Sequence, residues 1–352
     1  MRPRRSRAIA AILLSALAVA GLGVTVVRAA DDPALPAVSA QALLASTIEA
    51  ALHPVTISGK VTTTIDLGLP ELPTSVTTGV GLPGILTSLT GTQRWRVWHS
   101  PDGLRVAHLL VAREQDLVVN HDAAWWWDSA DLRAIRLDLA SMRSTAGDRS
   151  PAGTDTPIDP AGLARTLIQG MAPCASVSVQ GSTTVAGRDA YVLALTPLTE
   201  DSLVGSVRVA IDSETRLPLR AEVLPRGGGE PALSAGYTSV SFDPIDPAMF
   251  AFDPPPGSTV RDAAGLARDT AATGAGAGGE MPSVIDGRVF GECAGVIVAV
   301  ELDGPLPANA ARLLPFAGPV GSAIAIDRGG HTWVLAGLVD ASALEARAAE
   351  LP

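Results

Sequence analysis

The sequence predicts an α+β protein dominated by β-structure, with one large, curved antiparallel sheet followed by a small C-terminal α+β domain. Apolar and polar residues alternate through Val185–Val260, and each apolar run ends at Asp, Ser, Pro or Gly. This period of two is typical of hairpin-linked strands that bury one face. After Val260 the composition changes to a stretch rich in Gly and Ala, which separates a second group of short strands. The sheet region carries no nucleophile, phosphate or metal motif, so the sequence favours binding over catalysis.

The first thirty residues have the layout of an export signal. Arginines cluster before Ala8, an apolar run extends from Ala8 to Val27, and small residues follow it. The run is also close to the length that spans a bilayer, so a retained membrane anchor stays open beside cleavage. Residues 1–30 are therefore predicted to be a signal peptide or an N-terminal anchor, and the protein is predicted to be exported.

Charge narrows the range of partners. The chain has 352 residues, a formal charge of −10 and a single lysine, Lys60. An acidic protein is a poor match for a phosphate backbone or for electrostatic docking on anionic lipid. We therefore expect no nucleic-acid partner.

The N-terminal part of the predicted sheet follows a short spacer. Its predicted elements are a helix over Ser39–Leu52 with Ser39 as the N-cap, a strand over Val55–Ile65, a long apolar loop over 67–89, a hairpin over Thr90–Val111 with its turn at 100–103, and two or three short strands within 116–139. A long loop inside a regular domain is often functional or mobile. Simple packing of this loop on the sheet edge stays an open alternative.

The second half of the sheet begins after a polar loop at 141–157. Its predicted elements are a helix over Ile158–Met171 with Asp159 and Pro160 at its start, a strand from Ser176, and the meander that continues to Val260. Residues 261–283 are predicted to be a flexible linker. Residues 284–351 are predicted to form the small C-terminal domain, with a helical turn near 309–314 and a closing helix over 340–351.

Searches for reactive groups return weak candidates. His99 and His108 lie on facing strands of one predicted hairpin, and His121 is the nearby third histidine that a metal site would need. Their spacing matches none of the common zinc patterns, so ordinary strand histidines are the favoured interpretation. No G-x-S-x-G motif occurs, and the Gly-rich 273–279 stretch follows no strand, so it is no phosphate loop. We predict no enzyme activity, no metal and no cofactor.

Two cysteines occur in the chain, Cys174 and Cys293. In an exported protein they form a candidate disulfide that would join the sheet domain to the C-terminal domain. Two separately buried thiols are the alternative.

Tryptophans gather in two short runs. Trp95 and Trp98 lie in the first, and Trp125, Trp126 and Trp127 form the second. On a strand, Trp125 and Trp127 share one face and Trp126 takes the other. Core packing explains one such face. The second apolar face either lines a hollow or lies under a helix, and core packing alone stays open.

These segments resemble a known family. VAGRDAYVLALTP, LVGSVRVAIDSETRLPLRAEV and YTSVSFDPIDPAMFAFDPPPG resemble the LolA-like lipoprotein-carrier superfamily, especially its actinobacterial members. DLGLPELP, TQRWRVWHSPDGLRVAHL and DLVVNHDAAWWWDS match earlier strands of that group. The segment from VIVAVEL to the closing helix resembles the small C-terminal domain of MucB/RseB proteins.

This resemblance implies a half-barrel over residues 36–260, with helices covering its concave face and a hollow that binds lipid, lipopolysaccharide or the acyl chains of lipoproteins. The wall of the hollow would include Trp95, Val97, Trp125 and Trp127, or the set of opposite parity, together with Val192, Val207, Val209 and Leu219. The lid helices would contribute Leu44, Ile48, Leu163 and Leu167.

Two functions follow from these predictions. The first is a carrier-like protein that holds lipid or an acylated lipoprotein. The second is a MucB/RseB-type regulator that uses residues 284–351 to bind a membrane anti-sigma factor or a transporter, which is an analogy at the level of the fold. A hydrolase with a dispersed site is a weaker third hypothesis.

Overall fold

The computed structural model describes residues 32–52, 55–68, 91–140, 160–263, 265, 284–306 and 308–351. Contacts divide the chain into Met1–Asp32 and one compact unit, Pro33–Pro352. The predicted signal segment, residues 69–89 of the apolar loop, the 141–157 loop and almost all of the 261–283 linker lie outside the described residues. The division of residues 36–351 into two domains therefore stays a prediction.

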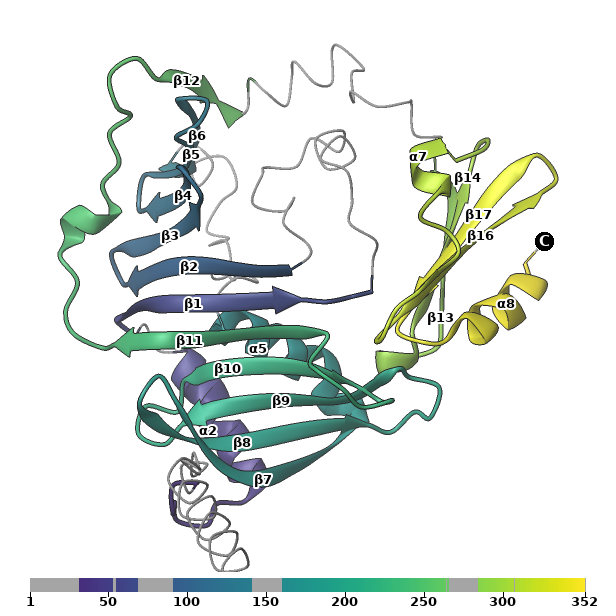
Figure 1. Cartoon of the computed structure of the whole chain (residues 1–352), viewed down its shortest axis with the longest axis horizontal. Helices are drawn as coiled ribbons and strands as arrows, with labels where there is room; N and C mark the ends of the chain where they lie inside the picture. Colours follow the sequence, from purple (N-terminus) through teal and green to yellow (C-terminus); the bar gives the residue numbers. More distant parts are fainter. Residues whose placement is uncertain are drawn as a thin grey trace, which may run out of the picture. The chain divides into compact units, whose positions relative to one another are not determined.

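Within the described residues, the large sheet has twelve strands in the order β12-β6-β5-β4-β3-β2-β1-β11-β10-β9-β8-β7 (Figure 1). The first six strands are β1 Ile57–Ile65, β2 Gly91–Ser100, β3 Gly103–Leu110, β4 Arg113–Asn120, β5 Ala123–Asp128 and β6 Arg133–Asp138. The others are β7 Ala175–Val185, β8 Arg188–Pro197, β9 Val204–Asp212, β10 Pro218–Pro225, β11 Leu233–Ser241 and β12 Thr259–Asp262. Strands β1–β6 are called the N-terminal arm and β7–β11 the helix-covered arm.

The two arms join through β1, which pairs with β2 on one side and with β11 on the other. Each arm is a meander of neighbouring strands, as the alternating pattern predicts. Register shifts between Lys60 and Val61 and between Val179 and Ser182 mark bulges, which bend and twist a strand. The predicted β-dominated α+β fold with one large curved sheet is confirmed.

One part of the predicted meander is wrong. The antiparallel run ends at Ser241, and β12 pairs in parallel with β6 at the far edge of the sheet. Between β11 and β12, the chain runs past the strands of the N-terminal arm (Figure 1). The short 3₁₀ helix η3 (Pro247–Phe250) contacts β3 and β4 on the way. Strand alternation cannot distinguish a neighbouring partner from a distant one, because both bury one face.

Gly103 shows why this crossing segment lies so close to the sheet. A Cβ at this position would lie 2.3 Å from the carbonyl oxygen of Val119 and 2.9 Å from the ring of Phe250. The predicted turn at 100–103 joins β2 to β3, with Ser100 paired with Gly103. The lack of a side chain at Gly103 therefore permits both the hairpin and the close packing of η3.

Helices α2 and α5 pack on one face of the helix-covered arm. Helix α2 (Ala40–Leu52) begins where the Ser39 hydroxyl accepts a hydrogen bond from the Ala42 amide, as predicted for an N-cap. Helix α5 (Pro160–Met171) starts with proline, whose missing N–H is tolerated in the first turn. Its buried residues include Leu163, Ile168 and Met171. The face of the sheet on which both helices pack is called the inner face.

Buried apolar side chains fill the space between these helices and the sheet. The fully or nearly buried members from the helices and from β8–β10 are Leu43, Leu163, Ala164, Ile168, Met171, Tyr191, Leu193, Leu195, Val204, Val207, Val209, Ile211, Ala221 and Val223. Burial of this apolar surface is the main force holding the helices to the arm.

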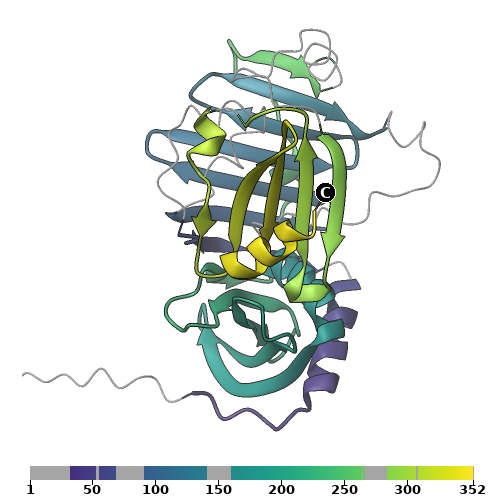
Figure 2. The same cartoon turned by 90° about the vertical axis from the view of Figure 1, so that its right-hand side faces the viewer.

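The small sheet has five strands in the order β13-β14-β17-β16-β15 within the described residues. They are β13 Val284–Phe290, β14 Ile297–Leu302, β15 Phe316–Ala317, β16 Ser322–Arg328 and β17 His331–Gly337, with the turn of helix α7 at Ala308–Ala311. Helix α8 (Ala341–Ala349) lies across one face of this sheet (Figure 2). Its Asp340 N-cap accepts a hydrogen bond from the Ala343 amide, and Trp333, Leu335 and Leu344 fill the core beneath it.

Candidate ligand-binding site

An apolar pocket of about 360 Å³ lies where the end of α5 meets the helix-covered arm and the small sheet. This volume falls within the range of small-ligand sites, roughly 300–1,000 Å³. Its lining comes from Leu67 after β1, from Thr166, Leu167, Gly170 and Met171 of α5, from Val204, Val207, Val223 and Leu233 of β9–β11, and from Cys293, Ala294, Val320 and Leu338.

Apolar side chains of helix α5 lie in two different places. Leu163 and Ile168 are buried in the core of the arm, whereas Leu167 is only partly buried and reaches the pocket. Gly170 is the small residue of the pocket wall, and a Cβ there would meet no atom within 4 Å. The helix therefore closes the arm with one side and leaves apolar surface open to the pocket with another.

Segments of the small sheet supply the opposite wall. Val320 is 6% exposed and belongs to the same buried cluster as the core of the helix-covered arm. The Leu203 amide donates to the Leu338 carbonyl at 2.7 Å, and Ser202 forms an isolated β-bridge with Val339. The pocket is therefore shared between the two sheets.

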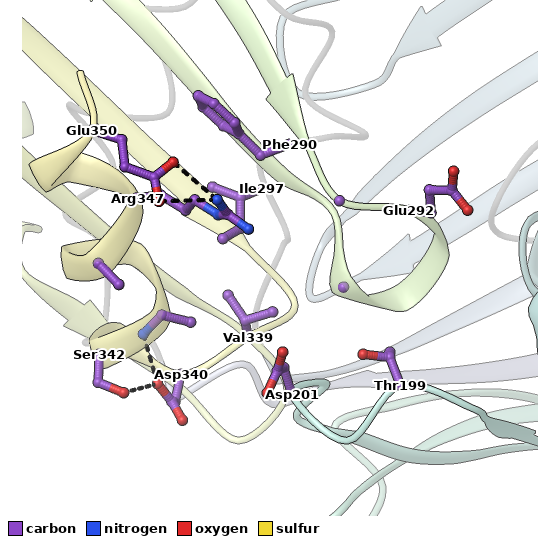
Figure 3. Close-up of a pocket in the computed structure, with 14 residues that line it drawn as sticks. Thr199, Asp201, Phe290, Glu292, Ile297, Val339, Asp340, Ser342, Arg347 and Glu350 are labelled. Atoms are coloured by element: carbon purple, nitrogen blue, oxygen red, sulfur yellow. Dashed lines mark hydrogen bonds and ion pairs between the residues drawn. The ribbon is translucent and has the colours of Figure 1, made fainter. Parts of the chain in front are cut away.

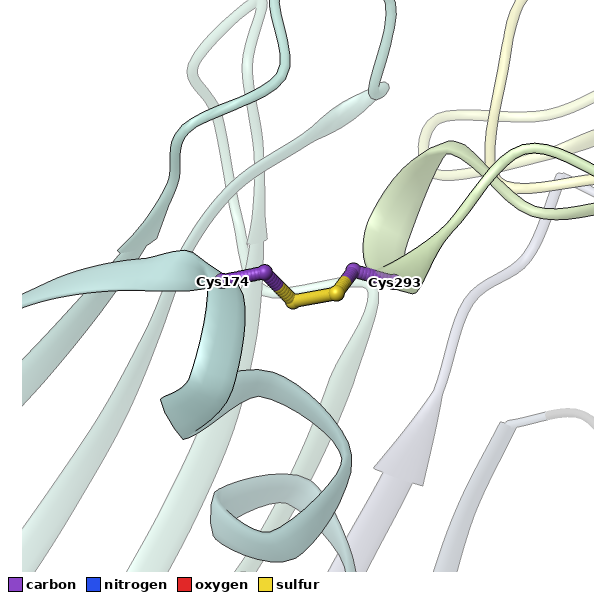
Figure 4. The surroundings of a disulfide bond; sticks show 2 residues. All are labelled: Cys174 and Cys293. Atoms are coloured by element: carbon purple, nitrogen blue, oxygen red, sulfur yellow. A yellow bond between two sulfur atoms is a disulfide. The ribbon is translucent and has the colours of Figure 1, made fainter.

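A disulfide joins the two walls at one side (Figure 4). Cys174 lies in the 3₁₀ helix η2 (Ala172–Cys174), directly after α5, and Cys293 begins the 3₁₀ helix η4 (Cys293–Gly295). Their Cα atoms are 6.3 Å apart. The bridge fastens the end of α5 to the segment that leads into the small sheet.

The chemistry of the pocket is uniform. Among the described residues that line it, none has an ionisable side chain, and the Thr166 hydroxyl already donates to the Gly162 carbonyl at 3.0 Å. A lining without a free charge offers a polar ligand no compensation for lost hydration. The pocket suits an apolar ligand, whose affinity comes from surface removed from water.

A second, polar pocket lies beside α8 and has a volume of about 520 Å³ (Figure 3). Carboxylates from Asp201, Glu292, Asp340 and Glu350 surround it, with Arg347 paired to Glu350. Hydrogen bonds from Ser342 and the Ala343 amide hold the pKa of Asp340 below its ordinary value. This pocket has the opposite chemistry to the apolar one.

A smaller groove of about 190 Å³ separates α2 from α5. Ile48 and Thr47 line it from α2, and Ala161, Arg165 and Ile168 line it from α5. Ile48 is 50% exposed, whereas its neighbour Leu43 is fully buried. Of the four lid residues predicted from the sequence, Leu163 lies in the core, Leu44 packs partly against it, Ile48 borders the groove and Leu167 reaches the apolar pocket.

The register separates the residues predicted to form one wall. Trp95 pairs with Val61 of β1. Thr63 lies on the same face of β1 as Val61 and pairs with Ala235, which belongs to the buried cluster beneath the helices. Trp95 and Val97 therefore lie on the inner face. Val207 and Val209 lie there too, beneath the helices, and only Val207 also reaches the apolar pocket. Leu219 is fully buried in the same cluster as Trp95.

Trp125 and Trp127 lie on the opposite, outer face. Their cross-strand partners are Val118 and Asp116, and both indoles contact Phe252 of the crossing segment, with ring centroids 5.4 and 5.9 Å apart. A wall that combines them with Trp95 and Val97 is therefore wrong. Val192 also has the parity opposite to its neighbours Tyr191 and Leu193, which pack beneath the helices.

The inner face of the N-terminal arm carries a row of buried polar side chains. His108 is fully buried, stacks on Trp95 with 3.9 Å between ring centroids, and places Nε2 2.9 Å from Gln93 Oε1. Trp95 Nε1 donates to Thr63 Oγ1 at 3.0 Å. Burial lowers the pKa of His108.

This row continues to the strands near the sheet edge. Gln115 Nε2 donates to Asp128 Oδ2 at 3.0 Å, and Arg113 Nε donates to Asp128 Oδ1 at 3.0 Å. Burial raises the pKa of Asp128, but the hydrogen bonds from Arg113 and Gln115 outweigh it and leave that pKa below its ordinary value. The row is a structural network that pairs most of its buried polar atoms; within the described residues, His108 Nδ1 is buried without a hydrogen-bond partner.

The predicted facing of His99 and His108 does not bring them together. His99 pairs with Leu104 and places Nδ1 3.0 Å from the Val55 carbonyl, whereas His108 pairs with Trp95. Within the described ranges, no group of three potential metal ligands is assembled. The arrangement gives these two histidines hydrogen-bonding and packing roles.

The sequence patterns do not identify several of the residues that line the apolar pocket. Val204, Val223 and Leu233 share the alternation that identified Val207, so the same signal could have found them. Val320 and Leu338 carry no such signal, because their place depends on how the small sheet docks. Cys293 was noticed as a bridge partner but not as a lining residue.

The fold and pocket define a curved, helix-covered sheet protein with an apolar site. Residues 167–235 match the model of the MucB/RseB N-terminal domain. This match confirms the predicted relation to MucB/RseB proteins, although the sequence resemblance lies in residues 284–351. The matched residues contribute seven of the thirteen lining residues of the apolar pocket, from Leu167 to Leu233. A comparison with curated protein sequences finds no significant match.

Solved structures similar to this chain include MucB in the MucA/MucB complex of Pseudomonas aeruginosa, with a TM-score of 0.46 and 14% identity over 87% of this chain and 96% of that chain. A crystal structure of MucB has a TM-score of 0.42 and 17% identity over 87% and 94%. A LolA superfamily protein from Nitrosomonas europaea has a TM-score of 0.25 and 15% identity over 62% and 99%. In the part of the chain that the structure describes, no helix has the length and apolar character needed to cross a membrane.

Proposed function

We propose that this chain is an exported, non-enzymatic binding protein that holds an acyl chain of a lipid or lipoprotein in the apolar pocket. The observation that carries the proposal is the lining of that pocket, which is contributed by both sheets and, over the part of the chain that the structure describes, is apolar and holds no ionisable group. The export signal at residues 1–30 and the match to the MucB/RseB N-terminal domain support an extracytoplasmic role.

Energetics favour an acyl ligand. Each buried methylene contributes about 0.8 kcal/mol, so roughly ten methylenes give a gross gain of about 8 kcal/mol. That gain corresponds to micromolar affinity before the entropic cost of binding is subtracted. No covalent chemistry is needed for such a function.

The test uses the mature full-length protein and a fluorescent fatty acid, cis-parinaric acid. We expect saturable binding, and we expect Leu167→Arg to abolish it because the guanidinium would enter the apolar wall. Leu109→Arg is the matched control, since Leu109 is 39% exposed on β3 and pairs with Glu114. A wild-type protein that neither binds the probe nor carries lipid in native mass spectrometry would refute the proposal.

A second candidate function is binding to a membrane partner, such as an anti-sigma factor or a transporter, in the manner of a MucB/RseB-type regulator. The observation that favours it is exposed apolar surface on the small sheet, where Val289 is 68% and Val298 is 43% exposed and the two residues pair across β13 and β14. We expect Val289→Arg/Val298→Arg to abolish capture of one specific membrane protein while leaving cis-parinaric acid binding intact. Unchanged capture by this variant would exclude the surface.

A further inference from the structure

Apart from the chain itself, the two sheets are held together by one disulfide, by apolar packing around Val320 and by a few backbone contacts. Both cysteines of the sequence form the Cys174–Cys293 bridge. Beside it lie the hydrogen bond from Leu203 to Leu338 and the β-bridge between Ser202 and Val339. Within the described residues, the disulfide is therefore the strongest single constraint between the walls of the apolar pocket.

The bridge is also part of the pocket itself. Cys293 and its neighbour Ala294 line the cavity from the side of the small sheet, while Gly170 and Met171 line it from the end of α5, just before η2. Any movement of η4 away from η2 therefore separates lining residues directly. No intervening element would absorb the displacement.

Chain connectivity does not replace the bridge. Strand β12 ends at Asp262 and β13 begins at Val284, so the chain itself joins the two sheets through about 20 residues, a length that does not by itself hold η4 against η2. Cys174 and Cys293 are both partly exposed residues. A cut bridge leaves the walls held by short-range packing around Val320 and by the contacts at Ser202 and Leu203.

We propose that the Cys174–Cys293 disulfide is a redox switch for the apolar pocket: the oxidised protein retains an acyl ligand, and reduction separates the walls and releases it. This inference rests on the acyl-binding function proposed above. The reductant is a dithiol, such as the active-site pair of an extracytoplasmic thiol oxidoreductase.

The exchange is a two-electron reaction. A thiolate of the dithiol attacks one sulfur of the bridge and forms a mixed disulfide, and its second thiolate then displaces the remaining protein sulfur. The protein disulfide is reduced to two thiols, each of which takes up a proton, and the dithiol is oxidised to its own disulfide. Re-oxidation by the reverse exchange restores the closed pocket.

The test measures binding of cis-parinaric acid to the mature full-length protein before reduction, after dithiothreitol, and after re-oxidation, with the thiol count followed by alkylation and mass spectrometry. We expect the reduced protein to bind at least about tenfold more weakly and the re-oxidised protein to regain its affinity. Circular dichroism should show that the reduced protein keeps its β-structure. The Cys174→Ser/Cys293→Ser variant should bind like reduced protein and ignore dithiothreitol.

The outcomes separate the two proposals. Equal affinity of oxidised and reduced protein would overturn the switch and leave acyl binding in place. Absence of binding by the oxidised protein would overturn both. Because reduction and re-oxidation use one wild-type sample, the result does not depend on the serine variant folding.

Discussion

The two arms of the large sheet differ in the polar side chains that they bury on the inner face. Beneath α2 and α5, the helix-covered arm packs aliphatic residues such as Leu193 and Val209. The N-terminal arm also buries apolar residues such as Val97, but beside them it buries His108, Gln115 and Asp128 within a hydrogen-bonded row. Apolar burial, which is non-directional, therefore acts in both arms, and the N-terminal arm adds hydrogen bonds that require a specific register.

Strand register is more strictly specified in the N-terminal arm than in the helix-covered arm. A one-residue slip in the N-terminal arm would leave buried polar groups unpaired, so the polar row fixes strand register. The apolar surface that α5 leaves open to the pocket carries no comparable row of hydrogen bonds among the described residues, so under the proposed function it would bind a ligand by apolar contact alone.

Leu193→Ala should produce the largest loss of stability. Leu193 is fully buried beneath the helices, and removing a buried leucine side chain to alanine costs about 2–5 kcal/mol. Urea unfolding followed by circular dichroism measures the effect. Leu109→Ala, at a residue 39% exposed on the N-terminal arm, should change stability by less than about 0.5 kcal/mol. Similar losses for the two variants would contradict the assignment of the core.

Asp128→Ala should destabilise the N-terminal arm by about 1–3 kcal/mol, because Gln115 stays buried without its acceptor and Arg113 loses its partner. Asp131→Ala is the control, since that carboxylate is 58% exposed and lies 3.5 Å from Arg133. We expect this exposed pair to contribute less than about 1 kcal/mol. The free energies of unfolding of both variants decide the comparison, and equal values would show that the polar row has no special weight.

The stability of the protein should fall as the pH drops below the unfolded pKa of histidine, about 6.5. Burial lowers the pKa of His108 in the folded state, so the unfolded chain takes up its proton first and acid favours unfolding. The slope from this one group is at most about 1.4 kcal/mol per pH unit. His108→Gln should flatten the curve between this pH and the lower folded pKa.

The control for this pH dependence is His331→Gln, whose side chain is 40% exposed on the small sheet. The slope of this variant is compared with that of His108→Gln. A second loss of stability is expected below the unfolded pKa of aspartate, about 3.9, because Asp128 has a lowered pKa and holds its hydrogen bonds only when ionised. A His108→Gln protein with the wild-type slope near neutrality would contradict the proposed role of His108.

Phe252→Leu should have the smallest effect, about 0.5–1.5 kcal/mol, because it removes the aromatic contacts to Trp125 and Trp127 while keeping an apolar side chain. Tryptophan fluorescence should shift with it, since both indoles lie on the outer face beneath the crossing segment. Phe252→Tyr keeps the ring and should restore the wild-type spectrum. An unchanged spectrum for Phe252→Leu would mean that the crossing segment does not pack there in solution.

Sequence patterns predicted most of the strands and the covering helices, because each strand has one buried face and each helix has an amphipathic stripe. Long-range pairing escaped them. Nothing in the alternation of β12 indicates that it crosses to β6 in parallel. The wall residues were mixed for the same reason: parity is fixed within one strand, but the face shared by Trp95 and Trp126 emerges only from the register of β2–β5. The part of the pocket formed by Val320 and Leu338 depends on docking between sheets, which no local pattern encodes.

The position of β1 limits when the large sheet can be completed during folding. Strand β1 (Ile57–Ile65) lies between β2 and β11, and its partner β11 (Leu233–Ser241) comes much later in the sequence than β2. Joining strands so distant in sequence gives a high contact order, which slows folding. A nascent chain lacks the central pairing until Ser241 is available. The two arms can therefore be joined into one sheet only after β11 has been made, and any chain that ends before Leu233 leaves one edge of β1 without its partner.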